Sequence, residues 1–199
     1  MKVKTITSAV LLFSMATLLA CTSPATDPTY YLMRGEPSEG ADRIDASMRF
    51  GLGRVSVAPY LLVDAGIVVE TAPGQVRAAR QHQWIEPVDA GLRWFLRGEI
   101  SRALGFQAGG GLLDRSEWDY SIDVYVGRMH GTLEGTALLE ALYVIRPVDR
   151  SSQAVMEYRF SKSIPLDDDG YEALVRAEMG LVKELANSIA AALRELPTS

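Results

Sequence analysis

The sequence contains a single cysteine, two histidines and none of the common catalytic motifs. A lone cysteine excludes a disulfide within the chain. His82 and His130 have no acid or second histidine beside them at metal-ligand spacing, so we interpret both as solvent-facing polar residues. The motifs G-x-S-x-G, H-E-x-x-H and the phosphate-binding loop are absent, and Ser121 and Ser163 have no recognisable partner base. The sequence thus predicts no enzyme, no metal site and no cofactor.

Basic residues are outnumbered by acidic ones. The chain has 20 lysines and arginines against 25 aspartates and glutamates. Removal of residues 1–20 would take away Lys2 and Lys4 and no acid, which makes the remaining chain more acidic still. An acidic surface argues against nucleic acid as a partner and against binding to an anionic membrane face.

The first 21 residues carry the most specific signal. Lys2 and Lys4 precede an uncharged, mostly apolar run over residues 6–20, which is too short to cross a bilayer and has the length of a secretory signal. The run ends in Leu18-Leu19-Ala20-Cys21, which resembles a lipobox. We therefore expect residues 1–20 to be a signal peptide that is cleaved between Ala20 and Cys21. Cys21 would then carry fatty acyl chains such as palmitate and become the membrane-anchored N-terminus.

The residues after the cysteine bear on location and reach. Thr22 and Ser23 follow Cys21 with no aspartate, which by resemblance to lipoprotein sorting signals favours the periplasmic face of the outer membrane. Residues 21–28 would form the lipidated N-terminus and a short tether, of which Thr22 to Pro28 spans about 23 Å at most at roughly 3.3 Å per residue. Residues 29–199 have a length suited to a single domain with one core.

Hydrophobic periodicity predicts an α+β domain: a mostly antiparallel sheet with two main helices packed on one face. A helix should begin at Pro87 and end at Gly105, and a second helix should follow the aspartates at 167–169, which we interpret as helix-capping residues rather than a calcium site. The strand over residues 137–146 has apolar residues on both faces, which suggests a central strand covered on both sides. The predicted strands cover residues 30–34, 54–58, 67–70, 75–80, 120–126, 137–146 and 153–161, and loops cover 36–40 and 107–112.

Two aromatic residues, Tyr60 and Trp84, lie at predicted element ends. They can be anchors at the edge of the core, or they can contribute to a contact surface, because tyrosine and tryptophan are enriched at interfaces. The sequence leaves both interpretations open.

A family resemblance includes both aromatics. The segments Val55-Ser56-Val57-Ala58-Pro59-Tyr60-Leu61, Ile67-Val68-Val69 and Trp84-Ile85-Glu86-Pro87, in this order behind a lipobox, resemble the PqiC/YmbA family of auxiliary lipoproteins. The resemblance covers roughly residues 28–196. It makes Pro59, Tyr60, Leu61, Trp84, Glu86 and Pro87 signature positions, each a possible partner contact.

The resemblance implies a non-catalytic auxiliary subunit of an ABC-type or MCE-type system that moves phospholipid, or another hydrophobic molecule, between membranes. The implied partners are an MCE-domain protein that spans the periplasm and an inner-membrane transport subunit. A homo-oligomer would suit a tubular partner. Two alternatives stay open, namely an assembly factor for another outer-membrane machine and a periplasmic hydrolase with scattered catalytic groups.

Overall fold

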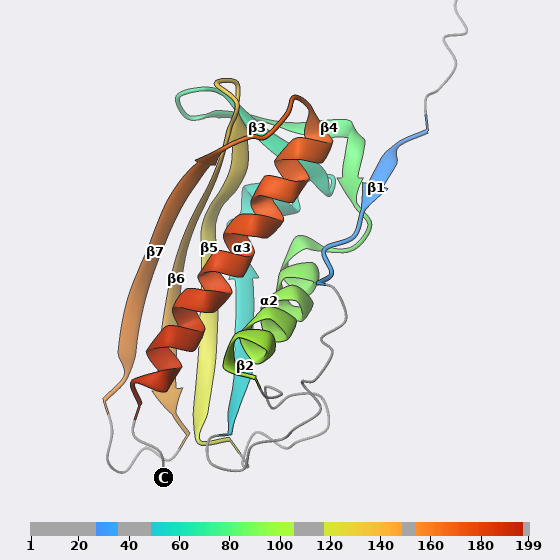
Figure 1. Cartoon of the computed structure of the whole chain (residues 1–199). Coiled ribbons are helices and arrows are strands. Elements are labelled where there is room, and N and C mark those ends of the chain that lie inside the picture. Colours follow the sequence, from blue (N-terminus) through green and yellow to red (C-terminus); the bar gives the residue numbers. More distant parts are fainter. Residues whose placement is uncertain (1–26, 36–48, 106–117, 149–153, 197–199) are drawn as a thin grey trace, which may run out of the picture.

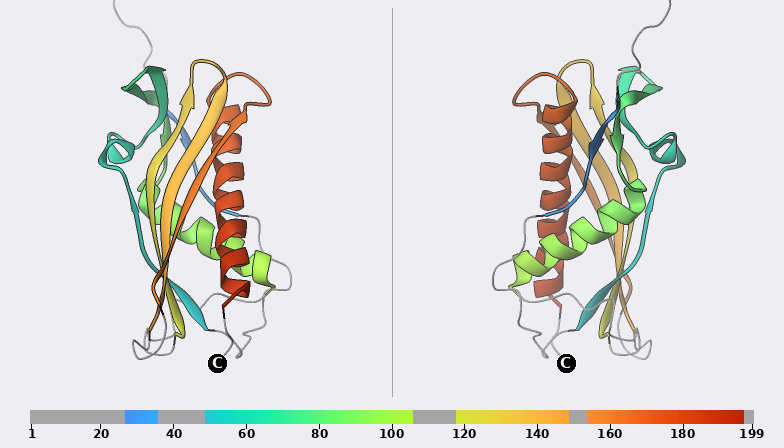
Figure 2. Two further views of the ribbon diagram at one scale, coloured as in Figure 1. Left: turned by 90° about the vertical axis from the view of Figure 1, so that its left-hand side faces the viewer. Right: turned by 90° about the vertical axis from the view of Figure 1, so that its right-hand side faces the viewer.

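The computed structural model describes residues 27–35, 49–105, 118–148 and 154–196. These residues form a seven-stranded mixed sheet and two long helices, which confirms the predicted α+β fold. Both helices lie on the same face of the sheet (Figures 1 and 2). The predicted signal peptide with Ala20, Cys21, most of the predicted tether and the predicted loops at 36–40 and 107–112 lie outside the described residues.

Three long strands form an antiparallel block of the sheet: β5 (Tyr120–Thr132), β6 (Thr136–Pro147) and β7 (Met156–Pro165). Along β6 every second residue is buried under the helices, and the residues between them are half-buried or exposed. The suggestion that this strand is covered on both sides is therefore wrong. Its second face is shielded by neighbouring strand side chains and by no helix in the described part of the chain.

The other edge of β5 pairs with two strands that come earlier in the chain. β2 (Phe50–Val57) runs parallel to the first half of β5, and β3 (Gly66–Ala72) pairs in parallel with Gly131 and Thr132 near its end. Between them lie η2, a short 3-10 helix over Pro59–Leu62, and a tight turn in which Asp64 and Ala65 have positive φ angles of 54° and 52°. Hydrophobic periodicity does not reveal these parallel pairings, since it reports which face is buried and not which strand is the neighbour.

The predicted hairpin at residues 67–80 is present, and Gly74 supplies the positive φ of its turn. Its second strand, β4, is longer than predicted and covers Gln75–Trp84. The pairing of β3 with β4 is irregular between Gly66 and Val68. Beyond this irregularity the last three residues of β4 pair in parallel with β1 (Thr29–Tyr31).

The helices begin close to their predicted starts. α2 (Val88–Leu104) starts one residue after Pro87, and it ends at Gly105, whose left-handed backbone lets its N–H bond to the last carbonyl groups. α3 (Tyr171–Arg194) buries its apolar stripe against β5, β6 and β7 and packs against α2. No helix among the described residues is long and apolar enough to cross a membrane.

The aspartates before α3 do not cap it. Gly170 is the N-cap residue and no side chain bonds to the first turn. Instead, Asp167 forms an ion pair with Arg176 at 2.9 Å, and the carboxylate of Asp168 accepts the N–H of Asp169. The Asp167 carboxylate, which we expected at the helix N-terminus, thus pairs with the guanidinium of Arg176 instead.

Candidate docking surface

The first signature segment forms η2. Leu61 is buried, Pro59 is exposed and Tyr60 is half-buried. The hydroxyl of Tyr60 accepts the backbone N–H of Met129 at 3.3 Å, which fastens η2 to β5 where the β5–β6 pairing is irregular. Burial raises the pKa of this hydroxyl, so it stays protonated at neutral pH.

The second signature segment joins β4 to α2. Trp84 is 5% exposed, packs edge-on against Tyr31 and donates its backbone N–H to the carbonyl of Ala65 at 2.8 Å. Because Ala65 closely follows η2, this bond holds the two signature segments together. Trp84 lies in the core, whereas Glu86 is half-buried and Pro87 exposed.

Glu86 is part of an exposed surface that the sequence analysis did not predict. Its carboxylate forms a two-pronged ion pair with Arg34, whose guanidinium lies 5.9 Å from the ring centre of Trp94. Arg97 lies 5.7 Å from the same ring. Trp94 is 54% exposed, an unusual state for the largest apolar side chain.

Two further exposed apolar side chains belong to the segments that carry the Arg34–Glu86 ion pair. Leu32 and Ile85 are both about half exposed, and the bond from the Ile85 N–H to the carbonyl of Tyr31 keeps their segments side by side. We call the combined surface the α2 platform; it consists of Leu32, Arg34, Ile85, Trp94, Arg97 and Gly98. The signal that could have revealed it is the position of Trp94, which falls outside the apolar stripe Val88, Leu92, Phe95, Leu96 and Ile100.

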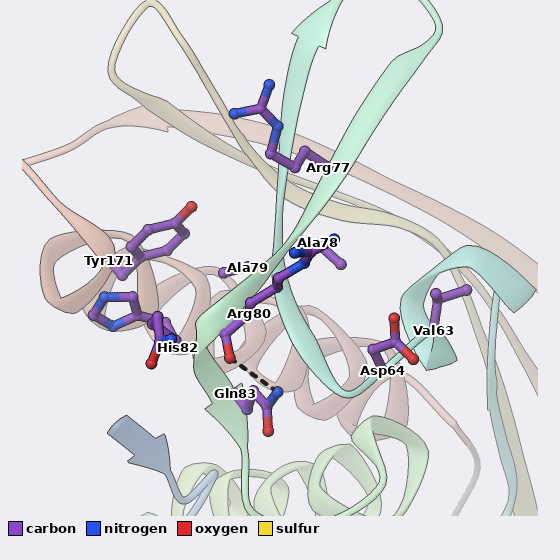
Figure 3. Close-up of a pocket in the computed structure, with 10 residues that line it drawn as sticks. Val63, Asp64, Arg77, Ala78, Ala79, Arg80, His82, Gln83 and Tyr171 are labelled. Atoms are coloured by element: carbon purple, nitrogen blue, oxygen red, sulfur yellow. Dashed lines mark hydrogen bonds between the residues drawn. The ribbon is translucent and has the colours of Figure 1, made fainter. Parts of the chain in front are cut away.

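A second feature is an open groove of about 980 Å³ beside β4 (Figure 3). Arg77, Arg80 and His82 supply its basic groups and Asp64 its carboxylate. His82 stacks on Tyr171 at 4.4 Å and accepts or donates a hydrogen bond with the hydroxyl of Tyr31 at 2.9 Å. The residues that line the groove include no serine, threonine or cysteine.

The prediction that His130 faces solvent is wrong, because it is 2% exposed. Its Nδ1 lies 3.1 Å from the carbonyl oxygen of Gly131, which accepts the hydrogen bond, and its ring packs edge-on against Tyr60. The imidazole thus bonds to a backbone carbonyl of its own strand, β5, and not to solvent as we expected. His82 is half-buried.

Glu178 is a further buried polar residue, on α3. Its Oε2 atom has no hydrogen-bond partner among the described residues, and burial raises its pKa to about 8. It is therefore an uncharged acid inside the core at neutral pH. No group of three metal-ligating side chains occurs within the described ranges.

Comparison with known proteins gives a consistent result. Two crystal structures share the fold. One is of an uncharacterized protein, with a TM-score of 0.70 and 20% identity, and the match covers 84% of this chain and 99% of the other. The second is of protein XCC0632 from Xanthomonas campestris, with a TM-score of 0.60 and 16% identity, and the match covers 84% of this chain and 92% of the other. No curated protein sequence matches significantly. The sequence model of the family described as "ABC-type transport auxiliary lipoprotein component" matches residues 30–190, which is most of the chain. The chain therefore belongs to this family of auxiliary transport lipoproteins.

Proposed function

We propose that this protein is a non-catalytic subunit that holds one end of an intermembrane lipid transport system at the outer membrane. In this role, acyl chains on Cys21 fix the domain to the bilayer, and the domain docks an MCE-domain protein that spans the periplasm. The family match supports the transport role, and the lipobox with Thr22 and Ser23 supports the location.

The observation that carries the docking role is the α2 platform. A half-exposed tryptophan with two arginines beside it has the composition of a protein-binding hot spot. It lies on a helix that packs against α3 and β2, so the partner would meet a rigid surface.

The anchor and the tether fit this role. Two or three acyl chains hold a protein on a membrane far more firmly than one, because each buried CH₂ adds about 0.8 kcal/mol. A tether of about 23 Å keeps the domain close to the bilayer. The partner's far end would therefore be held within a few nanometres of the outer membrane.

Cross-linking in cells tests the proposal. The lipidated protein is purified after cross-linking, and we expect an MCE-domain protein and an inner-membrane transport subunit to be recovered with it. Recovery of an outer-membrane barrel protein alone would favour the assembly-factor alternative. If no transport subunit is recovered from wild-type cells, the proposed function is wrong.

A further inference from the structure

We propose that the α2 platform binds an acidic amphipathic helix of the transport partner, and that Gly98 allows this helix to approach α2 closely. The proposal rests on the proposed function and adds to it a surface and the chemistry of what binds there.

Gly98 is an exposed glycine within α2. It lies inside α2, where glycine is less favourable than alanine because it costs more backbone entropy. A Cβ at this position would meet no atom within 4 Å, so no contact among the described residues requires glycine. Gly91 on the same helix differs, since a Cβ there would come within 3.2 Å of Glu86 and of Met33.

Gly98 also lies next to Trp94. The two residues are four positions apart in α2 and so share one exposed side of the helix. The distance between two packed helices depends on the side chains at their contact, and a glycine permits the closest approach. An exposed aromatic beside an exposed glycine gives a partner helix an apolar contact and a site for close backbone approach.

The charges of the platform specify the occupant. Arg34 is paired with Glu86, and Arg93 donates to the carbonyl oxygens of Leu52 and Gly53. Arg97 forms no ion pair within the described residues. The nearest acid on its own helix face, Asp89, lies one turn before Arg93. A carboxylate from outside could therefore pair with Arg97 beside the Trp94 ring.

These features together describe the partner segment. Its apolar side chains would cover Leu32, Ile85 and Trp94, and at least one of its carboxylates would meet Arg97. An amphipathic helix carries both kinds of side chain at the required spacing.

The test compares two glycines. Gly180 lies in α3 and, like Gly98, has open space where a Cβ would be. Gly98→Ala and Gly180→Ala should each raise Tm by about 2 °C, because both remove a helical glycine. In the cross-linking assay with the full lipidated chain, Gly98→Ala should lower recovery of the MCE-domain protein at least about tenfold. Gly180→Ala should leave recovery unchanged.

Trp94→Ala and Arg97→Glu test the contacts themselves. We expect a loss of about thirty-fold for Trp94→Ala, which is typical of a hot-spot residue, and about tenfold for Arg97→Glu. A photo-cross-linking amino acid in place of Leu32 should label an acidic helical segment of the partner. Replacing the labelled segment's acid by lysine should restore binding to Arg97→Glu.

The outcomes separate the two proposals. If all platform variants recover the MCE-domain protein as wild type does, the platform proposal is overturned and the proposed function stands. Labelling of a segment without carboxylates also overturns it. If wild type recovers no transport subunit, the proposed function itself fails.

Discussion

At the residue scale, the structure separates signature residues that shape the fold from residues that a partner can reach. Trp84 and Leu61 are buried, and Tyr60 bonds to the backbone of β5. Glu86 contributes to the proposed docking surface, because it pairs with Arg34, whose guanidinium lies beside the exposed Trp94. A short sequence motif can thus mark a binding surface indirectly, by orienting side chains that are not part of the motif.

Tyr60→Phe should lower the free energy of unfolding by about 1–2 kcal/mol, because it leaves the Met129 N–H without its hydroxyl acceptor. Urea denaturation of the soluble domain measures this loss. Recovery of the partner should stay at the wild-type level. Reduced recovery with unchanged stability would instead make Tyr60 a contact residue.

Glu178 makes stability depend on pH. Its pKa is about 8 in the folded protein and ordinarily 4.5, so between these values the unfolded chain releases a proton that the folded chain keeps. Its contribution to stability is full below about pH 4.5 and is lost as the pH rises toward 8, by up to about 1.4 kcal/mol per pH unit.

Glu178→Gln, which mimics the protonated acid, should remove this dependence. We expect the free energy of unfolding of the variant, relative to that of wild type, to be higher at pH 7.5 than at pH 5. Urea denaturation at both pH values measures this difference. If the two proteins keep a constant difference across this range, Glu178 is ionised in the folded state and the argument fails.

At the element scale, the sequence predicted the helices and strands whose positions depend on the local pattern of apolar, proline and glycine residues. The start and end of α2 followed from Pro87 and Gly105, and α3 followed from its apolar stripe. β4 was predicted too short, because its pattern is interrupted where the pairing with β3 is irregular.

The parts that were missed depend on distant contacts. The buried state of His130 depends on the packing of Tyr60, from η2, against its ring, and the ion pair of Asp167 joins the loop before α3 to Arg176 within that helix. The exposure of Trp94 could have been predicted from its place outside the apolar stripe, but its pairing with Arg34 could not. Local periodicity reports burial and carries no information about partners from other elements.

Gly51 tests the close packing of β2. A Cβ there would lie 2.2 Å from the indole ring of Trp118, so Gly51→Ala must displace the ring or the strand. We expect a loss of about 1–3 kcal/mol in the free energy of unfolding. Gly180→Ala, where space is open, should have the opposite sign in the same denaturation assay. An unchanged stability for Gly51→Ala would mean that the ring moves freely.

At the scale of the whole molecule, the proposed lipid anchor and the proposed docking surface lie in separate parts of the chain. The described part of the chain begins at residue 27, and the first platform residues, Leu32 and Arg34, follow β1 directly in the sequence. Folding of the domain should not depend on the lipid, whereas its place in the envelope should.

Cys21→Ala should therefore yield a protein with the wild-type Tm that fails to complement a deletion strain. Membrane fractionation should show its loss from the outer membrane. Thr22→Asp serves as a second variant, since by the sorting resemblance it keeps the lipid and moves the protein to the inner membrane. Full complementation by the unanchored form would show that the anchor is dispensable.

The shared edge of β5 has a consequence for the order of events during biogenesis. Arg49, just before β2, bonds to Asp119, just before β5, across 70 residues of chain. If residues 1–20 direct export as we propose, β2 and β3 would emerge before β5, the strand with which both pair, and such distant pairings form slowly. The acyl chains would therefore be attached to a chain that has not yet folded, and the domain would assemble while already fastened to a membrane.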